Sequence, residues 1–490
     1  MITYDFIELK SPHLYEHLYL CIKEDIKSGK LKPNAKLPSK RNFSKQLGVS
    51  TITVENAYAQ LLAEGYLYAL PRKGYYISDI SDLSDIMAIK QTQSPFGIMA
   101  IKHPPSPDLP LMHDEPATVT VPEYEFDFLN NHSGADLFPF PTWAKLLRTV
   151  ITDKSVELLN PPPCGGLMEL RMAISDYLYQ FRRMSVKPEQ IIIGAGTEYL
   201  YGLLIQLFDQ SSVYAIEDPG YTKICKIYES NHVSYIPLPL DQDGIQLDAL
   251  IKADPDILHI SPSHHYPTGI MTPVKRRHEL LRWAMEKTSR YIIEDDYDSE
   301  FRLTGIPIPS LQSIDTCGQV IYMNTFTKTL SPTIRISYMI LPPALVDRFY
   351  ENLGFYACTV SNFEQYTLAR FIKDGYFEKH INRMRKYYKE QRSCLLNDIK
   401  KSPLSAYSTI IEEDAGLHFL LQINTTLSDD VLIERAHQNK IRISCLSQYY
   451  HTPNVKDSHT ILINYSGIRK EEMATAIDRL YHCIFDSVTT

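Results

Sequence analysis

The sequence predicts a multidomain chain, in which a small N-terminal α+β module precedes a larger α/β domain that carries a smaller α/β subdomain. Its 490 residues exceed the length of one ordinary domain. The first 78 residues show the apolar spacing of three helices followed by a hairpin. Beyond residue 123, amphipathic helices alternate with short apolar strands, a pattern typical of a mainly parallel sheet with helices on both faces.

The composition is that of a soluble globular protein. Hydrophobic residues make up 44% of the chain and charged residues 22%, close to the globular average. The start lacks the basic and apolar regions of a secretory signal, and no uncharged apolar stretch of about 18 residues occurs, so we expect neither export nor membrane insertion. The eight cysteines include no CxxC pair. We therefore expect reduced thiols, no metal framework and a cytoplasmic location.

Basic charge is concentrated at the amino end. Residues 1–78 carry 11 Lys+Arg against 7 Asp+Glu, an excess of +4, so the net charge of -8 leaves -12 for the rest of the chain. This asymmetry is expected of a polyanion-binding head on an acidic body. A solvated surface without a binding role explains an excess of this size as well.

Three helices are expected in the N-terminal module, each between two capping residues. These pairs are Ser11 and Gly29, Ser39 and Gly48, and Ser50 and Gly65. Only residues 48–50 separate the second helix from the third, which is the short turn of a helix-turn-helix. Segments 66–70 and 75–78 then predict a hairpin with a basic tip.

The third helix is a candidate for entry into the major groove of DNA, because we expect the face opposite its apolar stripe to be polar and free. The polar and basic candidates for DNA contact lie at the starts of helices two and three and at the hairpin tip: Ser39, Arg41, Ser50, Thr51, Thr53, Asn56 and Lys73. The start of helix two, with its N–H groups and a guanidinium, could grip a phosphate. On spacing alone, a three-helix packing unit with solvated charges remains an alternative.

Residues 31–78 resemble the winged helix-turn-helix of the GntR family. The residues that carry the resemblance occur in order as LPS, R, LGVS, TV, AY, L, EGY and KG. The resemblance implies a DNA-binding module whose contact positions are Ser39, Arg41, Ser50, Thr51, Thr53, Lys73 and Gly74. Thr51 departs from the family, which usually has Arg there, so one bidentate contact to guanine or phosphate is missing.

A domain boundary follows the hairpin. Residues 79–122 contain seven prolines and little periodicity, which predicts a partly extended linker between a module at 1–78 and a domain at 123–490. The strands expected in the larger domain are 190–193, 213–216, 257–260, 291–294 and 320–323. From about residue 344 onward, long helices and the strands 416–423 and 460–465 predict the smaller subdomain.

Polar residues follow two of these strands and suggest a cofactor site. Carboxyl ends of parallel strands are where ligand groups converge in such folds. Pyridoxal phosphate needs a lysine for its aldehyde, an acid at its pyridine nitrogen, and cations and hydroxyls for its phosphate. The candidates are Lys328, Asp295, Tyr297 as donor to the phenolic oxygen, Thr325, Thr327 and Arg335 with the Gly194–Thr197 turn for the phosphate, and Tyr221 for ring stacking. On spacing alone, a surface lysine and a solvated or metal-binding acidic run explain the same residues.

From about residue 127 to the end, the chain resembles fold-type I aminotransferases, and specifically the MocR/GabR branch of GntR regulators. The motifs that carry the resemblance are DPGY at 218–221, SPSHHYPTG at 261–269, IIEDDYDSEFR at 292–302 and NTFTKTLSPTIR at 324–335. The resemblance implies the following pyridoxal phosphate site: Lys328 as the cofactor lysine, Asp295 and Tyr297 on the ring, Tyr221 stacking, and Gly196, Thr197, Thr325, Thr327 and Arg335 around the phosphate.

Four departures from the family leave the ligand open. Tyr266 stands where aminotransferases have an Asn that binds the phenolic oxygen. Glu198 replaces a usual Gln near the phosphate, which its carboxylate would repel unless it points away. Lys223 stands where GABA-responsive relatives have an effector-binding Arg, and residues 461–465 lack the Arg that often holds a substrate carboxylate.

The resemblance implies a pyridoxal-phosphate-dependent transcription regulator that binds a double-stranded DNA operator as a homodimer. Its aminotransferase-like domain would sense pyridoxal phosphate, or an amine or amino-acid effector, by a population shift. The alternative is a catalytically active aminotransferase with an attached DNA-binding module, since sensing and transamination share their first chemical step. A third interpretation is a DNA-binding protein whose body has lost the cofactor. The missing carboxylate-binding Arg favours sensing.

Overall fold

The computed structural model describes residues 14–64, 66–70, 73–78, 124–130, 137–302, 309–411, 416–452 and 456–486. The chain divides into two compact units, Met1–Thr118 and Val119–Thr490. The predicted caps Ser11 and Gly65 and the predicted linker at 79–122 lie outside the described residues. Within the described ranges, no helix has both the length and the apolar character needed to cross a membrane.

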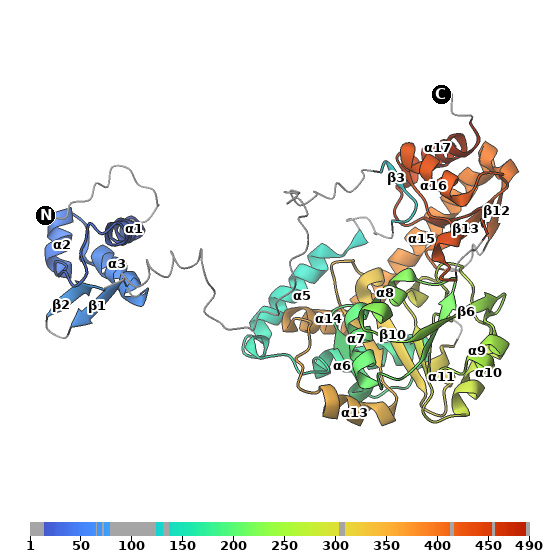
Figure 1. Cartoon of the computed structure of the whole chain (residues 1–490), viewed down its shortest axis with the longest axis horizontal. Coiled ribbons are helices and arrows are strands. Elements are labelled where there is room, and N and C mark those ends of the chain that lie inside the picture. Colours follow the sequence, from blue (N-terminus) through green and yellow to red (C-terminus); the bar gives the residue numbers. More distant parts are fainter. Residues whose placement is uncertain are drawn as a thin grey trace, which may run out of the picture. The chain divides into compact units, whose positions relative to one another are not determined.

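The N-terminal unit contains the predicted three helices and hairpin (Figure 1). Its elements are α1 (Leu14–Lys27), α2 (Lys40–Leu47), α3 (Thr51–Ala63), β1 (Leu67–Leu70) and β2 (Gly74–Ile77). The hydroxyls of Ser39 and Ser50 accept hydrogen bonds from the N–H groups of Asn42 and Thr53, at 3.3 and 3.0 Å, which confirms both predicted N-caps. Gly48 ends α2 in the left-handed conformation, with φ at 69°.

One core holds the three helices of this unit together. Leu18 and Ile22 from α1, Phe43 from α2, and Val54 and Leu61 from α3 are fully buried in it. The core therefore covers the inner face of α3, and the opposite face of this helix is exposed.

Eight strands form the central sheet of the C-terminal unit, in the order β4-β11-β10-β9-β8-β5-β6-β7. They are β4 (Ile191–Gly194), β5 (Tyr214–Asp218), β6 (Tyr235–Asp241), β7 (Gly244–Ile245), β8 (Ile257–Ile260), β9 (Tyr291–Asp295), β10 (Val320–Thr325) and β11 (Ser337–Ile340). The five predicted strands correspond to β4, β5, β8, β9 and β10, and they run in one direction, as predicted. The sequence did not predict β11, which lies antiparallel between β4 and β10.

Helices cover both faces of this sheet. Ile191 and Ile193 pack into a core with α6 (Met168–Arg182), whereas Ile192 packs into another core with α7 (Thr197–Leu207). Because alternate side chains of a strand point to opposite faces, α6 and α7 lie on opposite sides. The other α-helices up to residue 373 are α5 (Phe140–Asp153), α8 (Thr222–Ser230), α9 (Leu247–Ala253), α10 (Val274–Met285), α11 (Leu311–Ile314), α12 (Phe326–Thr329), α13 (Pro343–Leu353) and α14 (Asn362–Lys373).

The C-terminal part forms the predicted smaller α/β subdomain. Its antiparallel sheet has the order β12-β13-β15. The elements are β12 (Ser408–Ile411), β13 (His418–Ile423), β14 (Ile441–Arg442), β15 (Thr460–Asn464), α15 (Tyr376–Lys401), α16 (Asp429–Gln438) and α17 (Met473–Phe485). The two predicted strands correspond to β13 and β15. The first strand of the unit, β3 (Phe126–Asp127), pairs with β14, so the start of the unit is joined to this subdomain.

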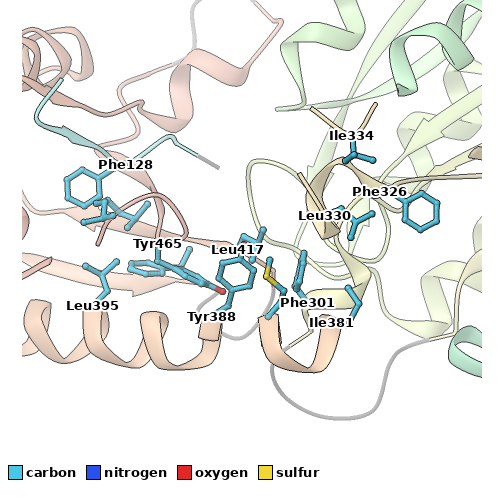
Figure 2. Close-up of a cluster of buried hydrophobic side chains, with 14 of the residues drawn as sticks. Phe128, Phe301, Phe326, Leu330, Ile334, Ile381, Tyr388, Leu395, Leu417 and Tyr465 are labelled. Carbon is cyan, nitrogen blue, oxygen red and sulfur yellow. The ribbon is translucent and has the colours of Figure 1, made fainter. Parts of the chain in front are cut away.

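A continuous apolar core connects the subdomain with the end of the central sheet (Figure 2). Tyr388 of α15 packs edge-to-face on Phe301, with the ring centroids 5.1 Å apart. Phe326 and Leu330 belong to the same core and are each only 2% exposed. They bracket Lys328 in the sequence, so this core fixes the backbone that carries the lysine.

Candidate functional site

The strand register brings several predicted residues to one edge of the central sheet. Gly194, Ser337 and Thr325 are paired in a row across β4, β11 and β10. Asp295 pairs with Met323, two residues before Thr325. This edge holds the carboxyl ends of β4, β9 and β10, where ligands bind in open α/β sheets.

Two of the three acids that end β9 and follow it are paired with buried arginines. Arg182 donates to the Asp296 carboxylate at 2.5 Å, and both side chains are almost fully buried. Glu294 lies 3.5 Å from Arg277 and also accepts two backbone hydrogen bonds from the start of α11. The charges of these two acids therefore face arginines of the fold itself. Among the described residues, no group of three or more His, Cys, Asp or Glu is arranged to hold a metal ion.

The third acid, Asp295, is buried without a cation. Its Oδ2 accepts a hydrogen bond from the Tyr201 hydroxyl at 2.5 Å, while Oδ1 has no hydrogen-bond partner in the described part of the chain. The His259 ring lies 4.0 Å away, but burial lowers the pKa of His259 to about 3, so this ring is neutral at pH 7. Burial raises the pKa of Asp295 to about 6. The carboxylate is thus available to a cationic ligand.

Lys328 lies in α12, the single helical turn after β10. The hydroxyl of Thr325 caps this turn by accepting a hydrogen bond from the N–H of Thr327 at 3.1 Å. Burial lowers the pKa of Lys328, and the nearby Asp298 carboxylate opposes this effect. A lowered pKa increases the fraction of neutral amine, which is the form that attacks a carbonyl carbon.

A buried pair of His264 and Asp298 adjoins Lys328 and Tyr297. Nδ1 of His264 lies 2.7 Å from Oδ2 of Asp298 and 3.2 Å from the Tyr297 hydroxyl. Burial raises the pKa of Tyr297 well above its ordinary value, so its hydroxyl keeps its proton. Asp298 therefore links the two residues. Its charge opposes the lowered pKa of Lys328, and its carboxylate lies against His264, whose ring contacts the Tyr297 hydroxyl.

Cationic and hydroxyl groups gather at the other side of this edge. Arg335 and Lys223 both form ion pairs with Glu198, so this carboxylate does not point away from the site. Gly196 has φ at 93°, and a Cβ there would overlap the Arg335 guanidinium, so only glycine fits. Thr197 begins α7 directly after this turn. The arrangement can bind an anion in competition with Glu198.

Hydroxyl groups form a chain beside this anion site. The hydroxyl of Ser337 donates to that of Thr325, which in turn donates to that of Thr327, both at 2.8 Å. Ser337 lies in the same row of the sheet as Gly194. The hydroxyls predicted to hold a phosphate are therefore already oriented by the strand that the sequence did not predict.

Tyr221 lies in a loop that is attached to the smaller subdomain. Its ring is 44% exposed and meets the ring of Tyr266 edge-on, with the centroids 5.8 Å apart. The N–H of Gly220 donates to the carbonyl of Tyr449, and the Tyr266 hydroxyl lies 3.0 Å from that of Tyr449. The hydroxyl of Tyr266 is thus directed toward the subdomain.

The predicted DNA-contacting residues form a second candidate site in the N-terminal unit. Arg41 and Lys73 are exposed. The hydroxyls of Ser50 and Thr53 lie 2.8 Å apart, and that of Thr51 lies 3.3 Å from the Ser44 hydroxyl of α2. These polar groups support the start of α3 before any DNA is bound. Ser39 has the same capping role in α2, and Gly74 begins β2 with φ at 109°.

Sequence reasoning missed three side chains of the sheet-edge site and one of the N-terminal site. Tyr201 lies one helical turn after Thr197, and this spacing is a signal that could have found it. His264 and Asp298 both fall within recognised motifs, but no local pattern pairs residues 34 positions apart. The fourth is Ile52, which is 68% exposed on a helix face that we expected to be polar.

Fold and sites together define a class of protein: a winged helix-turn-helix joined to an aminotransferase-like body. Residues 14–77 match the bacterial regulatory proteins of the gntR family, and residues 125–480 match aminotransferase class I and II. The chain belongs to the GntR family of transcription regulators and, within it, to the MocR type, whose members carry both domains.

Relatives with both domains match along almost their whole length. The uncharacterized HTH-type transcriptional regulator YdeL of Bacillus subtilis is 38% identical, over 95% of this chain and 96% of that protein. The probable rhizopine catabolism regulatory protein MocR of Rhizobium meliloti is 32% identical, over 95% and 93%. The pyridoxine biosynthesis regulator PdxR of Corynebacterium glutamicum is 29% identical, over 88% and 87%.

Solved structures confirm the fold of the C-terminal unit. Kynurenine aminotransferase of Pyrococcus horikoshii superposes with a TM-score of 0.66 at 21% identity, covering 84% of this chain and 95% of that one. The α-aminoadipate aminotransferase LysN of Thermus thermophilus, solved with a phosphopyridoxyl-leucine, gives 0.64 at 23% identity, covering 73% and 92%. The C-terminal unit is therefore a fold-type I aminotransferase fold, and this family is dependent on pyridoxal phosphate.

The raised pKa of Asp295 predicts a pH-dependent gain in stability for Asp295→Asn. The folded state binds this proton more tightly than the unfolded state, so the aspartic acid stabilises the fold only at low pH, and this contribution is lost as the pH rises through about 6. In the ligand-free chain, Asp295→Asn should raise the free energy of unfolding by up to about 3 kcal/mol at pH 8 and by roughly half of that at pH 5. Urea denaturation at both pH values measures this.

The matched control is Asp347→Asn, which changes an exposed acid of α13. It should shift stability by less than about 0.5 kcal/mol at either pH. Equal stability of Asp295→Asn and the unaltered chain at pH 8 would show that the Asp295 carboxylate is not strained by burial.

Proposed function

We propose that this regulator binds pyridoxal phosphate at Lys328 and adjusts its binding to a DNA operator when this cofactor, or an amine or amino acid that reacts with it, is present. The observation that carries the proposal is that a partly buried lysine of lowered pKa directly follows β10, while a buried carboxylate without a cation among the described residues ends the adjacent strand β9. A DNA-binding regulator of this kind acts on the chromosome, in the cytoplasm.

The residues at the sheet edge fit pyridoxal phosphate. The unpartnered Oδ1 of Asp295 is suited to a protonated pyridine nitrogen, which would supply the missing positive charge. Tyr297 would donate to the phenolic oxygen, and Tyr221 would stack on the ring. The residues that would hold the phosphate are Gly196, Thr197, Thr325, Thr327 and Arg335.

Pyridoxal phosphate, when bound, supplies an aldehyde that bonds reversibly to amines and a ring that withdraws electrons. The chain's own groups prepare this chemistry. Burial keeps part of the Lys328 population neutral. Asp295 would accept a hydrogen bond from the protonated ring nitrogen and so keep the proton there, and the hydroxyl of Tyr297 stays protonated beside His264. These three roles are the same whether the ligand is sensed or converted.

The combination of the two domains in one chain favours regulation over catalysis. The relatives that match over both domains are transcription regulators by name, whereas the match to aminotransferase class I and II is confined to residues 125–480. We further propose a homodimer with domain boundaries near residues 78 and 123. Paired modules would read two half-sites of an operator.

The function is tested by replacing the proposed cofactor lysine. Lys328→Ala should remain colourless after incubation with pyridoxal phosphate and dialysis, whereas the unaltered chain should turn yellow. Borohydride reduction followed by peptide mass spectrometry should find the label on the peptide that contains Lys328. Visible absorbance of Lys328→Ala equal to that of the unaltered chain would refute the assignment.

Lys226→Ala, which changes an exposed lysine of α8, is the matched control and should keep the colour. Mobility shifts with and without pyridoxal phosphate then connect the cofactor with DNA binding. Sustained product formation from an amino acid and a 2-oxoacid, at ordinary enzymatic rates, would contradict the sensor function and favour the aminotransferase alternative.

Glu198 is expected to weaken cofactor binding, because its carboxylate occupies the guanidinium of Arg335. Glu198→Gln should bind pyridoxal phosphate about tenfold more tightly, as expected when one charged competitor of about 1.4 kcal/mol is removed. Pyridoxal, which lacks the phosphate, should bind both proteins alike. Equilibrium titration by visible absorbance measures both affinities.

The control for this prediction is Glu157→Gln, which neutralises an acid paired with Lys154 on the surface. Its affinity for pyridoxal phosphate should be unchanged. Equal or weaker binding by Glu198→Gln would mean that Glu198 does not compete with the phosphate.

Arg41 is expected to contact a DNA phosphate. Arg41→Ala should weaken binding to all DNA sequences and reduce the slope of log affinity against log salt by about 1. Mobility-shift assays at several salt concentrations measure this. Lys30→Ala removes the same charge from a residue that pairs with Asp25, and it should leave the slope nearly unaltered. An unchanged slope for Arg41→Ala would exclude the phosphate contact.

A further inference from the structure

The outward face of α3 is apolar where it starts. Val54, Tyr58 and Leu61 are fully buried on the inner side of this helix. Ile52 and Asn56 are exposed and stand four residues apart, so they form one stripe on the opposite side. The isoleucine is 68% exposed and is the second residue of the helix. At the start of α3, the middle of the exposed face is therefore occupied by the branched hydrocarbon side chain of Ile52.

The polar neighbours of Ile52 are engaged in contacts within the unit. The Thr51 hydroxyl lies 3.3 Å from that of Ser44, and the Ser50 hydroxyl caps the helix. Lys40 donates to the Glu55 carboxylate at 2.6 Å, which ties this acid to α2 and balances its charge. The sequence of α3, TITVENAYAQLLA, contains no Lys or Arg. Hydrogen-bonding or charged groups therefore do not dominate the first turn.

Only one base edge in the major groove offers an apolar group, which is the C5-methyl of thymine. A single exposed apolar side chain is common on protein surfaces and has no meaning by itself. Ile52 differs because of its position, at the start of the helix that a helix-turn-helix inserts into the groove. Asn56, one turn further along the stripe, has the amide that pairs with adenine N6 and N7.

We propose that Ile52 determines operator specificity by packing against the C5-methyl of a thymine in each half-site. This inference rests on the proposed DNA-binding function. It also explains how α3 distinguishes bases with Thr51 in place of the family's arginine: selectivity for thymine comes from apolar contact. The Asn56 amide is placed to read an adenine near that thymine.

The test replaces thymine by deoxyuridine, which removes only the methyl group. Duplexes that bind the full-length chain are first selected from a random pool. Each thymine is then replaced in turn, and affinities are measured by mobility shift. For the unaltered chain, each half-site should contain one thymine whose single replacement by deoxyuridine weakens binding about fourfold, the value of one buried methyl group. Ile52→Ala should weaken binding to the thymine duplex and be insensitive to deoxyuridine there, because the two changes remove the same contact.

Two variants serve as controls. Ile52→Val keeps a branched side chain and should retain the sensitivity to deoxyuridine. Leu20→Ala removes another exposed apolar side chain of the same unit, 43% exposed on α1, and should leave binding unchanged. Because Ile52 is exposed, its alanine variant should fold normally, and its melting temperature checks this.

The inference is wrong if no deoxyuridine substitution weakens binding, or if Ile52→Ala keeps the full sensitivity of the unaltered chain. Both results leave the proposed function standing, since DNA would still be bound. Failure of the full-length chain to enrich any duplex would instead refute the DNA-binding function, and this inference with it.

Discussion

The buried carboxylate of Asp295, which has no cation beside it in the described part of the chain, is the constraint that gives the sheet edge its chemical character. Ionised groups are expensive to bury, and for Glu294 and Asp296 a buried arginine opposes this cost. Among the residues that the structure describes, Asp295 has only a tyrosine hydroxyl and a neutral imidazole beside it. A ligand that brings positive charge to this position relieves the strain, so the fold favours such a ligand at this one point of the edge.

Contacts around this sheet edge connect it to the smaller subdomain, which also pairs with β3 at the start of the C-terminal unit. Asp218 accepts a hydrogen bond from the N–H of His451 at 2.8 Å, and this fastens the loop of Tyr221 to the smaller subdomain. The same subdomain holds β3 through its pairing with β14, and β3 is the first described strand after the N-terminal unit. The loop of Tyr221 and β3 are therefore both held by the smaller subdomain.

Features that depend on neighbours in the sequence could be predicted, and those that depend on distant partners could not. The caps at Ser39, Gly48 and Ser50, and five strands of the sheet, follow from local spacing. The antiparallel strand β11 did not stand out in the sequence, because its four residues carry no turn or alternation signal. The pairings of Tyr201 with Asp295 and of Glu198 with Arg335 join residues 94 and 137 positions apart. The sequence motifs identified the candidate side chains, but the contacts between them could be found only from the folded structure.

The pairing of Glu198 also bears on whether the site senses a ligand or converts it. An aminotransferase must hold the substrate carboxylate while the amine reacts, and the strand β15, where many of them carry an arginine, has none in this chain. Its last residue, Asn464, is engaged with the N–H and hydroxyl of Ser466. Lys223 is a nearby cation, but it is paired with Glu198. In the proposed site, a phosphate that displaced Glu198 from Arg335 would leave Lys223 as the sole cationic partner of Glu198 among the described residues, so the proposed cofactor would reduce the charge available for a second carboxylate. This coupling suits a protein that responds to its cofactor more than one that turns over amino acids.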